Sequence, residues 1–431
     1  MDPVSAPTAS SGFDQSAGIV TSPHPTRLAI VVSHPIQYYV PLFRHLARRT
    51  DLDVTVLYSS LSGAQDYWDA GFGTTVKWDL PMLDGYRYKV LRSYFAGKRD
   101  PVSHGFSPGV VTEIIQGHYD AVMVFGWGRP TSWLAFWGAW LSGVPWMLHG
   151  DTNVIYEKEK RGLRGKLRKL VLRTLLNRTS AFLTTGTFNR EFYRYHGASP
   201  DKCFMVPLAV DNDYFAERAQ NAKADRAKIR RRYAIPQEAV LLLFVGKLVA
   251  CKRPQDLLYA IASLRGSQVW AAFAGDGELM PYLRSEAQRL ELRNVCFLGF
   301  RNQSELPEIY GISDVLVLPS SRDHKPLATN EAMACGLPVI ASDRTGVWGP
   351  GDIVRDGENG FVYPCGDIPR LAQAITSLVI DCNLRVRMGE RSRAIIQTFG
   401  YERCTEGILT ALHSLGPSNS TQHMGITNRV T

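Results

Sequence analysis

The sequence predicts an α/β protein with two units, each built on a parallel β-sheet that helices cover on both faces. Short apolar runs alternate with helical patterns along the chain, and continuous apolar strands between helices are typical of such sheets. The alternation starts again near residue 239, after a basic stretch. A chain of 431 residues is also too long for one core and fits two domains best. We therefore expect two doubly wound domains.

The first domain is expected over residues 27–215, after a flexible tail at 1–26 that lacks the apolar core of a signal peptide. Its predicted strands are the apolar runs at 27–33, 53–59, 121–125, 144–148, 181–185 and 203–209. A helix is predicted after the first strand, at 41–49, where the apolar residues recur with helical spacing.

One segment of the first domain has the length of a membrane span. No formally charged residue lies between Pro130 and Gly150. The segment contains four tryptophans, Trp133, Trp137, Trp140 and Trp146. Prolines and glycines divide it, however, into a strand, a helix over 131–143 and another strand. We expect a buried helix in preference to a transmembrane one.

A linker is expected over 216–238 and the second domain over 239–395. The predicted strands of this domain lie at 239–246, 269–275, 295–300, 314–319 and 338–342. A helix over 396–415 is expected to pack back towards the first domain, and a flexible tail to follow at 416–431. Open α/β sheets bind ligands at the carboxyl ends of their strands, so we expect the site between the two domains.

The charge is concentrated in two bands. The chain has 49 Lys and Arg against 40 Asp and Glu, a net charge of +9 that favours an acidic partner. Residues 157–178 carry a net charge of +7 and residues 223–232 carry +5, so the rest of the chain is slightly acidic. The seven cysteines are odd in number and form no C-x-x-C. This argues against a disulfide framework or a zinc site and favours a reducing cytosol.

The stretch 315–343 contains the most informative pattern. A predicted strand ends in a polar loop with Asp323, and Glu331 opens a short helix eight residues later. Carboxylates on a loop and a helix at one strand end can accept hydrogen bonds from the hydroxyls of a polyol. The amides of Leu327 and Ala328, at the helix start, point outwards and would hold a phosphate. Taken alone, Glu331 could equally be an ordinary residue of a first helical turn.

Two further loops of the second domain follow predicted strands. Lys247 and Lys252 lie five residues apart after the first strand. Two ammonium groups at such a position suit a diphosphate, although either lysine alone could be a solvated surface residue. The turn GDGE at 275–278 begins with Gly275. It indicates either a close approach to a ligand or a plain tight turn.

These motifs occur in an order that resembles the C-terminal domain of the family-4 retaining glycosyltransferases. The motifs are GKL-x3-K at 246–252, GDGE at 275–278, VCFLGF at 295–300, NEAMACGLPVIASD at 330–343 and DGENGFVYPCGD at 356–367. The first domain resembles the same family at 33–47 and 183–215. The resemblance implies the GT-B fold, in which two Rossmann-like domains face a central cleft.

The resemblance also implies a role for each motif residue. Lys247, where the family usually has Arg, and Lys252 would bind the diphosphate of a nucleotide-sugar donor. Glu331 would accept hydrogen bonds from the nucleotide ribose, and Asp323, where the family usually has Glu, would lie over the donor sugar. His149, in the segment MLHGDTN, would face the sugar from the first domain, with a purely structural role as the alternative.

Backbone groups complete the implied donor site. Gly275 would approach the nucleotide closely, and the amides of Leu327 and Ala328 would bind the phosphate. Pro326 replaces a usual glycine and has no N–H to offer. No D-x-D motif ends a strand and the lysines supply positive charge, so neither a metal nor another cofactor is expected. Closure of the domains about 212–238 would enclose the donor. The 33–39 loop would line the same cleft or serve local packing.

The band at 157–178 predicts an amphipathic helix. Its apolar face would contain Leu163, Leu167, Leu170, Val171 and Leu175. One interpretation is a surface helix that packs this face on the first sheet. The other, which we favour, is peripheral contact with an anionic membrane surface, because many enzymes of this type use lipid-linked acceptors. Nucleic acid is not expected, since no binding motif is present. The band at 223–232 is expected to be a solvated linker helix.

The expected function is therefore transfer of a sugar, with retention of configuration, to a hydroxyl of a glycan or a lipid-linked acceptor in polysaccharide or glycolipid synthesis. The enzyme is expected in the cytoplasm, at the inner face of the membrane. Two alternatives stay open. One is another GT-B enzyme, such as a nucleotide-sugar epimerase. The other is a non-catalytic glycosyltransferase-like subunit, which the replacements at Asp323 and Pro326 would fit.

Overall fold

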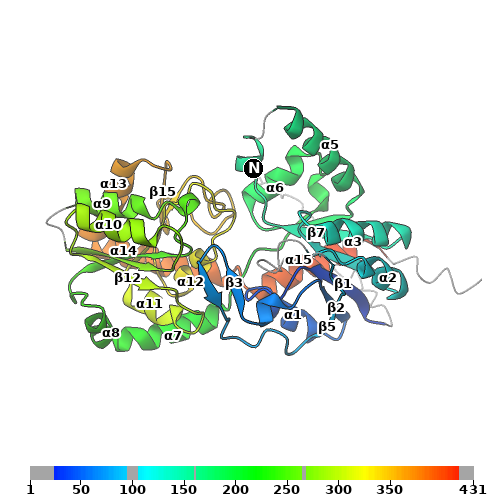
Figure 1. Ribbon diagram of the computed structural model, residues 1–431, viewed down its shortest axis with the longest axis horizontal. Coiled ribbons are helices and arrows are strands. Elements are labelled where there is room, and N and C mark those ends of the chain that lie inside the picture. The colour runs from blue at the N-terminus through cyan, green and yellow to red at the C-terminus, as the bar shows by residue number, and fades with distance from the viewer. Residues whose placement is uncertain (1–23, 95–104, 160–161, 265–267, 417–431) are drawn as a thin grey trace, which may run out of the picture.

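The computed structural model describes residues 24–94, 105–159, 162–264 and 268–416. These residues form two α/β domains that lie side by side (Figure 1). The two predicted tails fall almost entirely outside the described residues, and Thr26 already belongs to the first strand. Both predicted parallel sheets are confirmed.

The N-terminal domain is built on a sheet of seven parallel strands, in the order β5-β2-β1-β6-β7-β8-β9 within the described residues. The strands are β1 (Thr26–Val32), β2 (Leu52–Tyr58), β5 (Arg87–Val90), β6 (Ala121–Phe125), β7 (Trp146–Gly150), β8 (Ala181–Thr184) and β9 (Cys203–Met205). Alternate residues of β1 enter different cores: Leu28 and Ile30 belong to one, Ala29 and Val31 to the other. The sheet is therefore covered on both faces.

Helices from two distant parts of the chain cover this sheet. On one face lie α1 (Val40–Ala47) and α15 (Tyr401–Ser414). On the other lie α2 (Gly109–Gln116), α3 (Pro130–Leu141), α5 (Gly162–Arg178) and α6 (Thr187–Tyr195). The short helix α4 (Val154–Glu157) follows β7. The end of the described chain thus completes the core that its beginning starts.

The C-terminal domain contains a sheet of six parallel strands, in the order β12-β11-β10-β13-β14-β15 within the described residues. The strands are β10 (Val240–Val245), β11 (Val269–Ala274), β12 (Val295–Gly299), β13 (Val315–Leu318), β14 (Val339–Ser342) and β15 (Gly360–Tyr363). One face packs on α7 (Asn212–Ala224), α8 (Arg226–Arg232), α11 (Leu306–Ile312) and α12 (Ala328–Ala334). The other packs on α9 (Gln255–Ser263), α10 (Met280–Arg289) and α13 (Ile368–Ile380), while α14 (Cys382–Gln397) contributes to both.

In each sheet the strand order changes direction beside the first strand of the domain. β1 lies between β2 and β6, and β10 lies between β11 and β13. Loops that leave the two neighbours run to opposite sides, which opens a crevice at the carboxyl ends of these strands. The loops after β10 and β13 carry the predicted site residues Lys247, Lys252 and Asp323.

The segment predicted as a linker is part of the C-terminal domain. Ala219 and Ala222 of α7 and Ile229 of α8 are buried in the core beside α11. The chain crosses between the domains at 206–211, and again at 398–400 between α14 and α15. The side-chain amide of Asn212 donates to the carbonyl of Ile396 at 2.9 Å, which holds the two crossings together. The chain therefore passes between the domains at these two crossings and not within α7 or α8.

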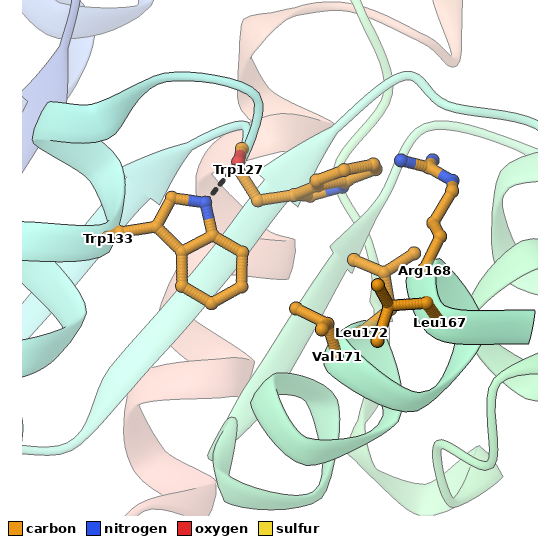
Figure 2. Close-up of a pocket in the computed structure, with 6 residues that line it drawn as sticks. All are labelled: Trp127, Trp133, Leu167, Arg168, Val171 and Leu172. Carbon is orange, nitrogen blue, oxygen red and sulfur yellow. Dashed lines mark hydrogen bonds between the residues drawn. The ribbon is translucent and has the colours of Figure 1, made fainter. Parts of the chain in front are cut away.

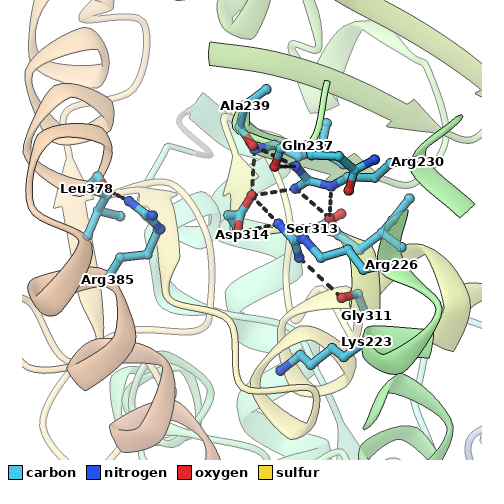
Figure 3. Close-up of polar contacts among 12 residues, drawn as sticks. Lys223, Arg226, Arg230, Gln237, Ala239, Gly311, Ser313, Asp314, Leu378 and Arg385 are labelled. Atoms are coloured by element: carbon cyan, nitrogen blue, oxygen red, sulfur yellow. Dashed lines mark hydrogen bonds and ion pairs between the residues drawn. The ribbon is translucent and has the colours of Figure 1, made fainter. Parts of the chain in front are cut away.

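The prediction of a solvated basic helix at 223–232 is wrong for Arg230, although Lys228, Arg231 and Arg232 are exposed. Arg230 is fully buried, and its guanidinium donates to the carbonyls of Ala239 and Ile312 and forms an ion pair with Asp314 at 2.8 Å (Figure 3). Arg226 forms a second ion pair with Asp314, also at 2.8 Å. Carbonyls and one carboxylate therefore replace water around these charges, which is the condition for burying them.

The Trp-rich helix α3 is not buried as predicted. Its inner face packs through Ala135, Phe136 and Ala139, whereas Trp137 and Trp140 are exposed. Among the described residues, no helix is long and apolar enough to cross a membrane. The packing of α5 also differs from the prediction. Its buried face is formed by Leu172, Leu175 and Leu176, and of the predicted apolar face only Leu175 is buried.

Candidate active site between the domains

Loops from neighbouring strands meet at the carboxyl edge of the C-terminal sheet. Gly246 and Lys247 follow β10, Gly275 follows β11, and Asp323 lies in the loop after β13. Gly275 has a φ of +151°, and a Cβ atom there would lie 1.9 Å from the carbonyl oxygen of Gly246. Only glycine fits where these two loops touch. Gly275 thus lies directly against the loop that carries Lys247.

Lys252 and Asp323, both predicted site residues, form an ion pair. The ammonium of Lys252 contacts Oδ2 of Asp323, and the hydroxyl of Ser320 lies 3.5 Å from the same oxygen. Asp323 is buried, so the pair is largely shielded from water and its attraction is stronger than at the surface. The structure therefore brings an acid and a base from two loops to one point.

Glu331 is buried in the first turn of α12. The hydroxyl of Tyr310 donates a hydrogen bond to its Oε2 at 2.7 Å. Burial raises the pKa of Glu331 above its ordinary value, while hydrogen bonds from Tyr310 and Gln303 oppose that rise. Tyr310 thus fixes the carboxylate in one orientation, which is what a receptor for neighbouring hydroxyls requires.

Leu327 and Ala328 stand at the start of the same helix. The amide of Thr329 donates to the carbonyl of Pro326 at 3.1 Å, and the amide of Glu331 donates to the carbonyl of Leu327 at 3.0 Å. Amides that precede the first helical hydrogen bond have no acceptor within the helix. Leu327 and Ala328 are therefore the residues whose amides this helix can offer to an anion.

Lys247 is bound by a carboxylate of the other domain, which the sequence did not predict. The hairpin of β3 (Tyr67–Asp69) and β4 (Thr74–Val76) lies between the domains (Figure 1), and Oδ1 of Asp69 is 2.7 Å from the Nζ of Lys247. The same Nζ lies 4.9 Å from the ring centroid of Phe72. A Cβ atom on Gly71 would be only 2.6 Å from Cδ of Lys247, so a larger residue there would displace the lysine side chain.

The loop that carries Asp323 also contacts the N-terminal domain. The amide of Asp323 donates to the hydroxyl of Tyr156, in α4, at 2.8 Å. The same hydroxyl donates to the carbonyl of Arg344. Tyr156 is a second residue that the sequence did not indicate, because its role depends on how the domains dock.

A buried ion pair lies at the same boundary. Nζ of Lys325 is 2.9 Å from Oδ1 of Asp352, and both side chains are buried. The other oxygen of Asp352 accepts a hydrogen bond from the amide of Thr187, in α6, at 3.0 Å. This carboxylate therefore links the loop before α12 to the N-terminal domain.

His149 is the last residue but one of β7 and is buried in the N-terminal domain. Its ring stacks on Phe125, with centroids 4.8 Å apart, and meets the edge of Tyr39 at 5.7 Å. Tyr39 belongs to the predicted 33–39 loop, which thus packs on the histidine. Burial lowers the pKa of His149 to about 4, so the imidazole is neutral at neutral pH. No contact among the described residues joins it to Asp323 or Lys252.

Metal ligands do not gather in the described parts of the chain. No group of three or more His, Cys, Asp or Glu side chains is placed to hold a metal ion there. All seven cysteines, which lie between Cys203 and Cys404, are free. The chemistry that the site offers is that of two lysines, the three carboxylates of Asp69, Asp323 and Glu331, and the backbone amides around them.

Two family models match most of the chain. Residues 225–395 match the model described as glycosyl transferases group 1, and residues 35–209 match the glycosyl transferase 4-like domain. Among curated proteins, a D-inositol 3-phosphate glycosyltransferase of Thermomonospora curvata is 29% identical over 68% of this chain and 71% of its own length. A protein of the same name from Corynebacterium jeikeium is 27% identical over 72% of this chain and 74% of its own length.

Solved structures share the two-domain fold. The Anabaena protein HepE, solved in complex with UDP and glucose, superposes with a TM-score of 0.69 at 18% identity, over 90% of this chain and 100% of that one. The sucrose-phosphate synthase of Thermosynechococcus elongatus superposes with a TM-score of 0.67 at 19% identity, over 90% and 99%. At these identities the likeness establishes the fold.

Proposed function

The chain belongs to the group 1 glycosyl transferases and has the GT-B fold, so it is a glycosyltransferase, and we propose that it transfers a sugar from a nucleotide-diphosphate sugar to a hydroxyl group of a glycan or lipid-linked acceptor. The observation that carries this proposal is the placement of Lys247, Lys252, Asp323 and Glu331 around the carboxyl ends of β10 and β13. The complex of the related Anabaena fold with UDP and glucose supports such a donor.

Each residue has a proposed task. Lys247, Lys252 and the amides of Leu327 and Ala328 bind the diphosphate, because cations and unpaired amides are the groups that hold phosphate oxygens. Glu331 accepts hydrogen bonds from the ribose hydroxyls. Asp323 and His149 bind hydroxyls of the donor sugar from the two domains, and Gly275 leaves room for the nucleotide. The neutral imidazole of His149 can both donate and accept.

We propose that the transfer retains the configuration of the anomeric carbon. The bond from this carbon to the diphosphate oxygen breaks, and the acceptor oxygen bonds to the same face of the carbon. The hydroxyl proton of the acceptor passes to the departing diphosphate. Lys247 and Lys252 stabilise the charge that develops on the diphosphate, which is electrostatic stabilisation of the transition state. Because these cations already neutralise the leaving group, we propose transfer without a metal ion.

A binding screen and a release assay test the proposal. A nucleoside diphosphate that binds the folded state raises the melting temperature, so UDP, GDP and ADP are compared with their monophosphates. Release of the nucleoside diphosphate from its sugar is then measured with and without acceptors, and with a chelator. The acceptors include D-inositol 3-phosphate, after the name of the relatives.

Variants assign the activity to the site. Lys252→Ala and Glu331→Ala are expected to abolish release, whereas the matched controls Lys89→Ala and Glu308→Ala, at exposed ion pairs elsewhere, keep it. If both site variants release nucleotide as the wild type does, the assignment is wrong. Conversion of a nucleotide sugar without any acceptor would instead identify an epimerase. Binding without turnover of any kind would identify a non-catalytic subunit.

We also propose that the enzyme works in the cytoplasm, at the inner face of a membrane. The support is the basic character of α5, which contains no acidic residue and lies in the N-terminal domain. An anionic surface attracts such a helix, and a lipid-linked acceptor would be presented there.

A further inference from the structure

Two helices of the N-terminal domain expose apolar stripes. On α3, Trp133, Trp137, Trp140 and Leu141 are between 38% and 54% exposed. Their spacing of i, i+4, i+7 and i+8 places them on one face of the helix. The opposite face carries Ala135 and Ala139 into the core. Large apolar side chains thus point outwards although the helix has a well-packed inner face.

Helix α5 repeats this arrangement. Leu163, Leu167, Leu170 and Val171 have the same spacing and are between 44% and 82% exposed. The inner face of α5 is supplied by Leu172, Leu175 and Leu176, which are buried. The exposed leucines are therefore not needed to hold the helix on the domain, and their exposure is unfavourable in water.

The two stripes form one continuous surface. Trp133 of α3 and Val171 of α5 line the same cavity of about 310 Å³, together with Trp127, Leu167, Arg168 and Leu172 (Figure 2). At the other end of the helices, the guanidinium of Arg178 lies 5.9 Å from the ring centroid of Trp140. We call the eight exposed apolar residues of α3 and α5 the α3–α5 surface.

Positive charge surrounds the α3–α5 surface. Lys166, Lys169, Arg173 and Arg178 of α5 are exposed, and neither α3 nor α5 contains an acidic residue. Glu157, which lies nearby, is buried and bound to Arg168 at 3.0 Å, so it does not offset these charges at the surface. Two copies of this chain that met through this face would bring like charges together, which argues against a dimer here.

We infer that the α3–α5 surface binds an anionic lipid bilayer, and that the cavity between the two helices takes part of a lipid hydrocarbon chain. This inference rests on the membrane contact of the proposed function and deepens it by naming the apolar surface that enters the bilayer and the cavity that receives lipid. Tryptophans prefer the interface between headgroups and hydrocarbon, and exposed leucines gain by entering the acyl region. The basic side chains of α5 then lie at the level of the phosphates.

Flotation of the full-length protein with vesicles tests the inference. Vesicles of phosphatidylcholine alone are compared with vesicles that also contain phosphatidylglycerol. We expect binding to the anionic vesicles, loss of binding at high salt, and little binding to phosphatidylcholine alone. Absence of binding to the anionic vesicles at low salt would overturn the inference, and so would equal binding to both kinds.

Substitutions locate the contact. Trp137→Ala with Trp140→Ala, and separately Lys166→Glu with Lys169→Glu, are expected to weaken binding about tenfold or more. The matched controls are Trp68→Ala, an exposed tryptophan outside this surface, and Lys228→Glu, an exposed lysine of α8; both are expected to bind as the wild type does. The surface is wrongly assigned if the controls lose as much vesicle binding as the α3–α5 variants, or if the α3–α5 variants bind vesicles as the wild type does.

Two further readouts separate this inference from others. Quenching of tryptophan fluorescence by lipids brominated along the acyl chain is expected for the wild type and is expected to fall in the Trp137 and Trp140 variant. Absence of quenching in bound protein would overturn the insertion. Binding of nucleoside diphosphates, measured by the melting temperature, is expected to be the same in every α3–α5 variant as in the wild type. If no nucleoside diphosphate binds the wild type, the proposed function is contradicted and the lipid contact is not.

Discussion

The carboxylate of Asp69 lies 2.7 and 2.9 Å from the ammonium of Lys247, although the two residues belong to different domains. Lys247 is also a proposed ligand of the donor diphosphate. In this proposed role Lys247 would bind a phosphate at the position where it now binds the carboxylate of Asp69, so the two anions would compete for it. The hairpin that carries Asp69 lies close to the loop after β11, since a Cβ atom on Gly277 would be 3.0 Å from the carbonyl oxygen of Gly71. We therefore propose that donor binding is coupled to the position of this hairpin.

Replacement of Asp69 by Asn is expected to tighten nucleoside diphosphate binding about two- to fivefold, because a competing anion is removed from a partly exposed ion pair. The dissociation constant, measured by calorimetry, checks this. Asp66→Asn, at an exposed ion pair with Lys77, is the matched control and should change nothing. Weaker binding in the Asp69 variant would show instead that Asp69 orients Lys247 for the donor.

Replacement of Lys252 by Met is expected to lower the unfolding free energy by about 1–3 kcal/mol, because it leaves the buried Asp323 without its partner. Adding Asp323→Asn should restore most of that stability, since the unpaired charge is then gone. Activity should stay lost in the double variant, because the diphosphate still lacks its cation. Denaturant unfolding and the release assay follow the two quantities separately. A double variant as unstable as Lys252→Met would contradict the pairing.

Replacement of Glu331 by Gln is expected to weaken donor binding about tenfold or more, since hydrogen bonds to a charged acceptor are the stronger ones. It is also expected to stabilise the free protein near pH 7. Burial raises the pKa of Glu331, so the stability that this group contributes is present at low pH and is lost as the pH rises and the buried carboxyl must ionise. Urea unfolding of both proteins at several pH values checks this, with Glu308→Gln as the control. A gap in stability that widens on acidification would contradict it.

His149 is expected to make the protein less stable as the pH falls, whereas Glu331 makes it less stable as the pH rises. Its pKa is lowered from 6.5 to about 4, so the unfolded chain takes up a proton more readily. The stability it contributes is present above pH 6.5 and is lost as the pH falls towards 4, by an amount on the order of 3 kcal/mol. Replacement by Phe should flatten the dependence between these values. His413→Gln, at an exposed position, is the matched control. A slope in the His149 variant equal to that of the wild type would refute the assignment.

The sequence predicted those parts of the site that depend on local order along the chain. Apolar runs mark β10 and β13, and the spacing of Asp323 and Glu331 follows from one loop and one helical turn. Asp69 and Tyr156 were missed because each meets its partner only when two separately folded domains dock. No motif near Asp69, in the segment YWDAGFG, signals that contact.

The sequence predictions for α5 and for Arg230 were wrong for a related reason. The pattern of residues along a helix does not show which of its sides faces the core. Helix α5 carries leucines on two sides, and the sequence alone could not tell that Leu172 and Leu176, rather than Leu163 and Leu167, pack inwards. The burial of Arg230 was missed because a run of basic residues normally indicates a solvated helix, whereas here carbonyls and Asp314 bind the guanidinium.

The position of α15 has a consequence for biosynthesis. Cys404, Ile408 and Ala411 of this helix are buried against the sheet that β1 begins. A ribosome releases α15 only after the whole C-terminal domain has been made, because that domain lies between α15 and β9 in the chain. Until then α1 covers only part of this face of the nascent N-terminal sheet, and the part that α15 will cover stays exposed while a second domain folds beside it. Exposed apolar surface of this kind favours aggregation or chaperone binding. The N-terminal core is therefore complete only once α15, the last helix of the described residues, has docked on it.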